Sequence, residues 1–202
     1  RLVFQSVLDS YGGLGGLPYD LNDLFRAAYT NGARIHSDSW GSSVAGEYTV
    51  DSQQVDQFVW SNRNMLIIFA ASNDGIDGNS DGVIDLDSTG SPGTAKNCLT
   101  VGAAESYRTS GGLSGYTWGN AWPSDYPANP VKNDYISRPD EPQGMAAFSS
   151  RGPCNDGRIK PDIVAPGTDI LSARSKATSD TGWGAFSGNT NYIVMGGPSM
   201  AT

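Results

Sequence analysis

Ser199 stands in a run of small residues, Gly196-Gly197-Pro198-Ser199-Met200-Ala201-Thr202. Proline fits the first turn of a helix, where its missing N–H is not needed, so we expect a helix to begin at Pro198. Free backbone N–H groups and the positive end of the helix dipole then lie beside the Ser199 hydroxyl. Such donors can stabilise the negative oxygen of a tetrahedral intermediate, which is acyl-transfer chemistry. The alternative is a helix N-terminus that the serine only caps.

A second group of residues has the spacing of a metal-binding loop. Residues 77–85 follow the pattern D-x-N-x-D-G-x-x-D, in which oxygen ligands alternate and a glycine marks the sharp turn. This matches the first half of an EF-hand-type calcium loop, although Ser88 stands where the strict loop has glutamate. Asp87, one residue earlier, could replace it, and the alternative is an acidic surface turn. The predicted ligands of a structural Ca²⁺ are Asp77, Asn79, Asp81, the Val83 carbonyl and Asp85.

Two amphipathic helices can be predicted from apolar spacing. The first follows Asp20 as N-cap and ends at Asn31-Gly32, and its apolar residues recur at i, i+3, i+4 and i+7. The second contains Val55, Phe58 and Val59 and closes near Asn62. We expect strands or strand-like apolar segments at residues 2–8, 34–39, 65–70, 98–102, 145–148 and 163–165. The segment 65–70 is continuously apolar, as in a strand that is buried on both faces.

The order strand, helix, strand, helix, strand predicts an α/β fold with a mostly parallel sheet and right-handed crossovers. Ligands bind beyond the carboxyl ends of the strands in such sheets. Two segments occupy this position, Ser39-Trp40-Gly41 and Ser72-Asn73-Asp74-Gly75. Residues 106–144 are rich in Pro, Gly, Asn, Asp, Tyr and Trp, and we interpret them as one long ordered surface excursion.

Length and charge limit the classes of function. A chain of 202 residues can form one substantial core. A net charge of −8 argues against nucleic acid or an anionic membrane as a partner. No apolar run reaches the roughly 18 residues that span a bilayer. The two cysteines, Cys98 and Cys154, form no disulfide framework, and we favour two buried thiols over a disulfide between them.

Seven segments, taken in order, resemble the motifs of subtilisin-like serine proteases, and most closely those of long-form bacterial alkaline subtilases. They are Ser39–Gly41, Ala70–Gly75, Ser91–Ala95, Val101–Ala103, Phe148–Pro153, Lys160–Gly167 and Gly197–Thr202. The resemblance implies a three-layer, doubly wound, subtilisin-like sheet. It implies that residues 1–202 are part of the catalytic domain of a secreted endopeptidase that cleaves proteins or peptides.

The same resemblance assigns roles to individual residues. Ser199 matches the nucleophile, and Asn73 matches the asparagine whose side-chain amide donates to the oxyanion. Ser39, Trp40 and Gly41 match the segment that pairs with an extended substrate backbone beside the first specificity pocket. The remaining predicted substrate-binding residues are Ala70, Ala71 and Ser72. Read without the resemblance, Asn73-Asp74-Gly75 is a turn after a strand and Trp40 is a packing residue.

The sequence departs from the family pattern in three ways. The motifs that carry the family aspartate and histidine are absent, and the single histidine, His36, lies within a predicted strand, where we expect a structural role. A serine without a base is a poor nucleophile, so we expect a missing N-terminal segment to supply both groups. Pro198 stands where the family usually has threonine. The loop at residues 77–87 is an insertion.

Two alternatives differ from a serine endopeptidase. One is a non-catalytic subtilase fragment or pseudoprotease that binds peptide or calcium. The other is an α/β-hydrolase esterase, because Gly197-x-Ser199-x-Ala201 resembles a nucleophile elbow.

Overall fold

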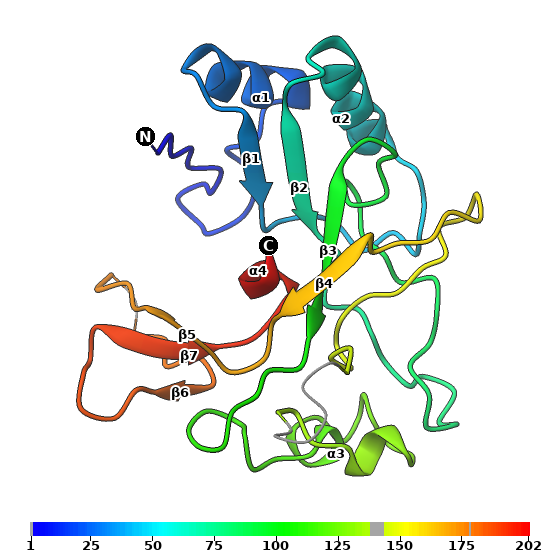
Figure 1. Ribbon diagram of the computed structural model, residues 1–202, viewed down its shortest axis with the longest axis vertical. Coiled ribbons are helices and arrows are strands. Elements are labelled where there is room, and N and C mark those ends of the chain that lie inside the picture. Colours follow the sequence, from blue (N-terminus) through cyan, green and yellow to red (C-terminus); the bar gives the residue numbers. More distant parts are fainter. Residues whose placement is uncertain (1, 138–143, 178) are drawn as a thin grey trace.

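The main sheet has four parallel strands. The computed structural model describes residues 2–137, 144–177 and 179–202. The strands lie in the order β1 (Ile35–Asp38), β2 (Leu66–Ala70), β3 (Leu99–Ala104) and β4 (Ile163–Pro166) (Figure 1). Every neighbouring pair is parallel, with Ile35 opposite Leu66 and Val101 opposite Ile163. The predicted α/β fold with a parallel sheet is therefore confirmed.

Helices lie on both faces of this sheet. Helices α1 (Leu21–Thr30) and α2 (Val50–Ser61) precede β1 and β2. Ile67 and Phe69 of β2 pack with them in one core cluster. Side chains alternate along a strand, so Ala70 points to the other face, where the short helix α4 (Pro198–Ala201) contacts β2, β3 and β4.

The predicted spacing of α1 is confirmed. The Asp20 carboxylate accepts the N–H of Asn22, which caps the first turn. The helix ends at Asn31, and Gly32 follows with φ +93°, a conformation that costs glycine little. The side chains that recur at i, i+3, i+4 and i+7 are all buried, namely Leu21, Leu24, Phe25 and Ala28.

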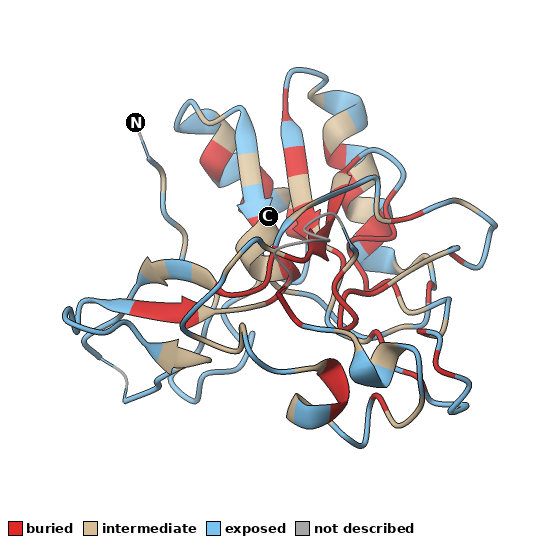
Figure 2. Ribbon diagram, turned by 60° about the horizontal axis from the view of Figure 1, so that its bottom comes forward, coloured by how far each residue is buried: buried red, intermediate tan, exposed pale blue. Residues whose placement is uncertain are grey.

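Burial concentrates at β2, β3 and the segments that follow them (Figure 2). Phe25, Val55, Ile67 and Phe69 are completely buried in the cluster between α1, α2 and β2. The rings of Phe25 and Phe58 lie 5.5 Å apart, within the range of favourable aromatic pairs. This cluster holds β1 and β2 in place against α1 and α2, and thus sets the position of the loops at the carboxyl ends of the two strands.

The excursion after β3 has little regular structure but carries a second core. It contains helix α3 (Trp118–Ala121) and the 3₁₀ helix η1 (Val131–Asn133), and residues 138–143 of the predicted excursion lie outside the described residues. Trp118 is completely buried, and its indole N–H donates to Glu105 Oε1 at 3.1 Å. It packs with Tyr126, Ile136 and Phe148. The prediction of a surface excursion is thus incomplete, because several of its side chains are buried.

A small antiparallel sheet, which the sequence did not predict, precedes the serine. It has the order β5 (Ile170–Ala173), β7 (Tyr192–Met195) and β6 (Gly184–Ala185). Strand β7 leads directly into α4, so this sheet anchors the segment that carries Ser199 (Figure 1).

Three local predictions are wrong or incomplete. Residues 2–8 are extended, with side chains alternately exposed and half-buried, but form no strand, because they have no ladder of backbone hydrogen bonds. Residues 145–148 form a tight turn with one bridge, Ala104 to Met145, because Ser149 N–H bonds back to Ala146 O. Strand β2 is not buried along its whole length, since Leu66 at its start is 41% exposed.

Cys98 and Cys154 are both buried and unbonded, as favoured from the sequence. Burial raises the pKa of both thiols above the ordinary value for cysteine. No helix in the described part of the chain is both long and apolar enough to cross a bilayer.

We predict that the folded protein reacts slowly with Ellman's reagent at pH 8. The thiolate is the reactive form, and a raised pKa together with burial lowers its availability. Addition of guanidinium chloride should release two titratable thiols within this domain. Recovery of thiols only after reduction would show that the cysteines pair instead.

Candidate active site

The carboxyl ends of β1 and β2 meet α4 at a pocket of about 220 Å³. The residues that line it are Ser39, Trp40, Gly41, Ala70, Ser72, Asn73, Gly90, Ser91 and Ser199. Predicted residues from three separate segments are therefore brought together. Ala71 is the exception: it is completely buried, its N–H bonds to Val101 O, and its carbonyl accepts from Gly90. Its predicted place on the pocket surface is wrong, because strand alternation turns its side chain inward.

The turn that carries Asn73 is held on both sides. The Asp74 carboxylate accepts from the hydroxyls of Ser43 and Ser72, and the Asp74 N–H donates to Ser150 Oγ at 3.0 Å. Gly75 N–H donates to Phe148 O, so the chain leaves the turn against a buried segment. Asn73 itself is exposed at the tip of the turn. The turn is thus fixed, while the Asn73 amide faces the pocket.

The segment 39–41 is anchored through Trp40. Its indole N–H donates to the buried Asp38 carboxylate at 3.0 Å, and its ring packs edge-on against Phe69 with centroids 5.2 Å apart. Trp40 therefore both packs against Phe69 and lines the pocket. A Cβ on Gly41 would lie 2.6 Å from Ser91 O, so only glycine allows the two backbones to approach this closely.

Ser199 occupies the first turn of α4. Gly197 has φ +144° and serves as N-cap, and Pro198 begins the helix as predicted. The N–H of a first-turn residue has no acceptor within its own helix, so the Ser199 N–H is available to a ligand. A Cβ on Gly197 would lie 3.3 Å from Asn73 Oδ1. The backbone just before the serine therefore passes close to the Asn73 side chain.

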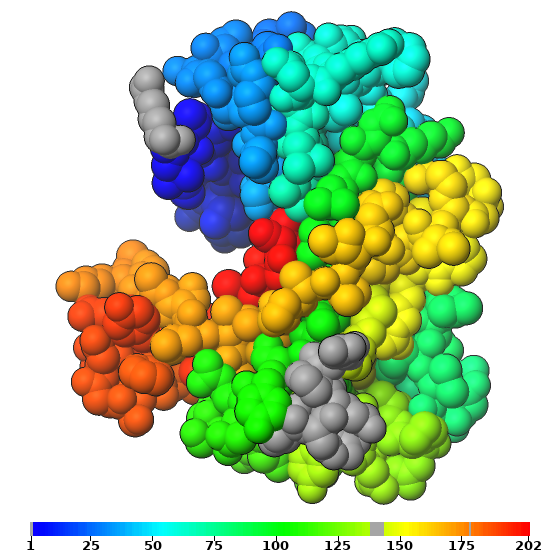
Figure 3. Space-filling model, viewed as in Figure 1, coloured from blue at the N-terminus to red at the C-terminus, as the bar shows by residue number. Residues whose placement is uncertain are grey.

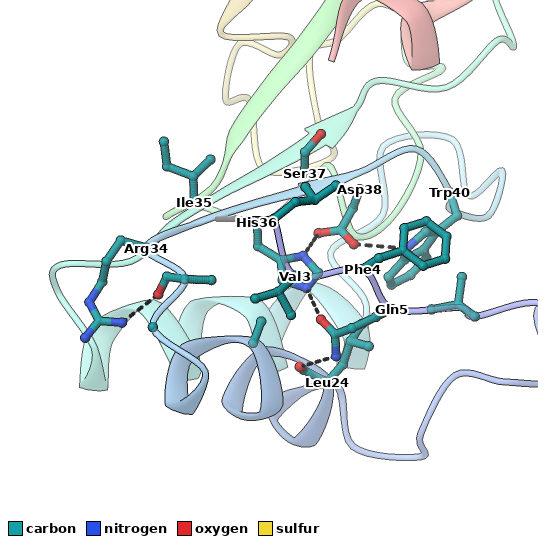
Figure 4. A pocket seen from close by; sticks show the side chains of 15 residues that line it. Val3, Phe4, Gln5, Leu24, Arg34, Ile35, His36, Ser37, Asp38 and Trp40 are labelled. Atoms are coloured by element: carbon teal, nitrogen blue, oxygen red, sulfur yellow. Dashed lines mark hydrogen bonds and ion pairs between the residues drawn. The ribbon is translucent and has the colours of Figure 1, made fainter. Parts of the chain in front are cut away.

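His36 does not belong to this pocket. Its Nδ1 lies 2.7 Å from the Asp38 carboxylate and its Nε2 lies 2.9 Å from Gln5 Oε1 (Figure 4). The ring also packs edge-on against Phe25 at 5.2 Å. Both ring nitrogens of His36 are therefore occupied by contacts away from the pocket, which fits the structural role expected for this residue.

The loop at residues 77–85 is folded around its own carboxylates. Asp77 is buried and accepts the N–H groups of Asp81 at 2.9 Å and Gly82 at 3.0 Å. Asn79 Oδ1 accepts from Asp81 N–H at 2.9 Å, and Asp81 Oδ1 accepts from Val83 N–H at 2.8 Å. Among the described residues, no group of three or more His, Cys, Asp or Glu is arranged to hold a metal ion.

Gly90 and Ser91 were missed as pocket residues. From the sequence, residues 90–95 are interpreted only as the segment that leads into the strand at 98–102, although Ser91–Ala95 is one of the seven family motifs. The backbones of Ser42 and Ser91 exchange two hydrogen bonds at 2.8 and 3.0 Å, which brings this segment against residues 39–41. A pairing of two isolated serines has no signature in the sequence.

Comparison with known proteins identifies the family. The profile of the subtilase family, Peptidase_S8, matches residues 8–202. The chain belongs to the subtilase family. The alternative of an α/β-hydrolase esterase is therefore wrong, although its nucleophile motif is similar.

Two curated relatives show how much of a longer protein this subtilase chain covers. It is 30% identical to the serine protease/ABC transporter B family protein tagD of Dictyostelium discoideum, over 92% of this chain and 12% of the relative. It is 30% identical to the serine protease AprX of Bacillus subtilis, over 75% of this chain and 28% of the relative. The chain thus spans less than a third of either relative.

Solved structures share the fold. Sphericase superposes with a TM-score of 0.51 at 23% identity, over 90% of this chain and 43% of that one. The self-cleaved protease domain of PatA gives a TM-score of 0.52 at 21% identity, over 90% of this chain and 46% of that one. The subtilisin-like α/β fold is therefore established.

Proposed function

We propose that this subtilase is a serine endopeptidase that forms an acyl-enzyme on Ser199. The observation that carries the proposal is the single pocket at which Ser199, Asn73 and the segment 39–41 meet, although these residues are distant in the sequence. A nucleophile, an amide donor and an accessible backbone segment are the parts that acyl transfer from a peptide requires.

In this mechanism, Ser199 Oγ attacks the carbonyl carbon of the scissile peptide bond. The oxygen that becomes negative accepts hydrogen bonds from the Asn73 side-chain amide and the Ser199 N–H. Both donors are fixed before the reaction, since the hydrogen bonds of Asp74 hold the Asn73 turn and α4 orients the N–H. The amine of the substrate then leaves, and water releases the acyl group from Ser199.

His36 is not suited to act as the base at this pocket. The chain contains one histidine, and both nitrogens of His36 are bonded away from the pocket. We propose that a further segment of the same protease supplies the histidine and the aspartate. Two features support this: α4 lies at the bottom of a notch between the N-terminal residues and the β5–β7 sheet (Figure 3), and β1 is an edge strand.

The edge of β1 borders a groove of about 640 Å³ that the extended residues 2–7 line on the opposite side (Figure 4). Leu2, Phe4 and Ile35 are 88%, 84% and 64% exposed beside it. An unpaired strand edge with apolar side chains around it is suited to an added strand. We propose that the further segment pairs here, which would place its carboxyl end near Ser39 and Ser199.

A non-catalytic, peptide-binding subtilase is the second candidate. The observation that favours it is Pro198, which removes a hydroxyl and an N–H beside the oxyanion position. Proline does not remove the N–H of Ser199, so the proposed oxyanion site keeps both donors.

The test of the proposed function is covalent labelling of the full-length protein by a fluorophosphonate probe. We predict that the wild type is labelled and that Ser199→Ala is not, since the probe reacts by attack of the serine oxygen on its phosphorus with loss of fluoride, and the variant lacks that oxygen. Ser61→Ala is a matched control, because it removes a hydroxyl at the exposed end of helix α2, away from the pocket, and should retain labelling. Equal labelling of wild type and Ser199→Ala would contradict the assignment, and absence of labelling in both would favour the non-catalytic alternative.

Removal of the second oxyanion donor gives a separate prediction. Asn73→Ala in the full-length protein should lower kcat about 10²–10³-fold with little change in KM, as when one donor to the oxyanion is lost. The turn should survive, since it is held by Asp74, Ser150 and Gly75 and not by the Asn73 side chain. A decrease of less than about threefold would mean that Asn73 is only a turn residue.

We also propose that the loop at residues 77–85 binds one calcium ion. Its side chains offer carboxylate and amide oxygens, the hard ligands that calcium prefers, and the Val83 carbonyl would add another. The backbone N–H groups around Asp77 support the proposal because they hold the loop in a closed turn. Gly82 is required at its position, since a Cβ would lie 1.7 Å from Asn129 O.

Thermal unfolding of the full-length protein with calcium and with chelator tests the proposed ion. An ion that binds only the folded state stabilises it by about 2.7 kcal/mol at a hundredfold excess over Kd. We expect Asp81→Ala to lose part of the calcium-dependent rise in Tm. Asp51→Ala, at an exposed position of helix α2, should keep all of it. An identical rise in wild type and Asp81→Ala would leave the loop as an acidic turn.

A further inference from the structure

A second pocket lies on the other side of Asn73. It has about 220 Å³ and is separate from the pocket that Ser199 lines. Its lining residues are Asn73, Gly75, Ile76, Trp122, Asp125, Tyr126, Phe148, Trp183 and Gly196. Asn73 is common to both pockets. A peptide whose carbonyl is bound at Asn73, with one flank in the Ser39–Gly41 pocket, would therefore direct its other flank here.

The walls of this second pocket are aromatic. The Trp122 and Trp183 ring centroids are 5.7 Å apart, and those of Phe148 and Trp183 are 5.9 Å apart. Tyr126 completes the group, at 6.4 Å from Trp122 and nearly perpendicular to it. Rings at these distances pack against one another and form a continuous aromatic wall, and aromatic faces attract cations.

Backbone contacts fix the aromatic rings close to the serine segment. A Cβ on Gly196 would lie 2.0–2.5 Å from Trp183 ring atoms, so the indole rests directly on the backbone three residues before Ser199. The Tyr126 hydroxyl donates to Gly75 O at 3.0 Å, two residues after Asn73. The pocket is thus built on the same two segments that carry the proposed nucleophile and oxyanion donor.

The charge of the lining is negative. The lining residues include one carboxylate, that of the exposed Asp125, and no lysine or arginine. Burial raises the pKa of Tyr126, so its phenol stays neutral and Asp125 sets the sign. The net charge of −8 acts in the same direction. Lysine and arginine combine an apolar stem with a cationic head, which matches aromatic walls with a carboxylate at the opening.

We propose that this aromatic pocket binds a lysine or arginine side chain of the substrate, on the leaving-group side of the scissile bond. The inference rests on the proposed endopeptidase function. Trp122, Asp125 and Tyr126 all come from the excursion at residues 106–137, whereas Asn73, Phe148 and Gly196 belong to segments with family motifs or adjoin one. The excursion therefore adds a selective subsite to the shared frame.

The first test compares peptides cleaved by the full-length protein. The three residues after the scissile bond are changed one at a time to lysine, norleucine or glutamate. At one position, kcat/KM should be about tenfold higher for lysine than for norleucine, which has a similar stem without the charge. Asp125→Asn and Trp183→Leu should each reduce this ratio to threefold or less. Asp51→Asn, which removes the same charge from an exposed position of helix α2, should leave the ratio unchanged.

The second test measures binding without cleavage. The Ser199→Ala protein is titrated with the same lysine and norleucine peptides, and Kd is determined calorimetrically with and without Asp125→Asn. Cleavage with equal rates for lysine and norleucine at every position would overturn the pocket and leave the proposed function standing. No cleavage, combined with Asp125-dependent preference for the lysine peptide, would overturn the function and support the pocket. No cleavage and no preference in binding would overturn both.

Discussion

The carboxylate of Asp74 is the group on which the arrangement of the active-site loops depends. It accepts from Ser43, just beyond the segment 39–41, and from Ser72 in its own turn. Its backbone N–H donates to Ser150, which lies in a third segment. These bonds hold Ser72 at φ +94°, a conformation that costs a residue with a side chain about 1–3 kcal/mol and persists only where the surroundings impose it. One residue, through its carboxylate and its backbone N–H, thus ties three segments around Asn73.

Two buried carboxylates, those of Glu105 and Asp169, help to attach the long excursion to the frame. Trp118 bonds to Glu105 at the end of β3. Near its two ends, Leu113 N–H and Ser137 Oγ both donate to the buried Asp169 carboxylate at 2.8 Å. Asp169 directly precedes β5, so the excursion and the small sheet share an anchor. Segments with little periodicity can therefore form a defined wall next to the site.

The parts that could be predicted from the sequence are those with local signals. Helix α1 has a capping aspartate and regular apolar spacing, and β2 has a continuous apolar run. The positions of Asn73 and Ser39 followed because both come directly after strands of a parallel sheet. Residues 2–8 have the composition of a strand, but a strand also requires a paired neighbour, which composition does not reveal. The aromatic core around Trp118 was missed because its members are scattered along the chain from Ile84 to Trp183 without a period.

The pocket also constrains the order in which the proposed active site can form. Ser39 Oγ donates to Ser199 O at 3.2 Å, a contact between residues 160 positions apart. Contacts of such sequence separation form late, because long loops must close first. During synthesis, Ser199 leaves the ribosome after every other residue of the pocket, and domains generally fold as units. A nascent chain therefore holds the segment 39–41 and Asn73 before it holds Ser199, so the proposed oxyanion site cannot form until the serine segment has been made.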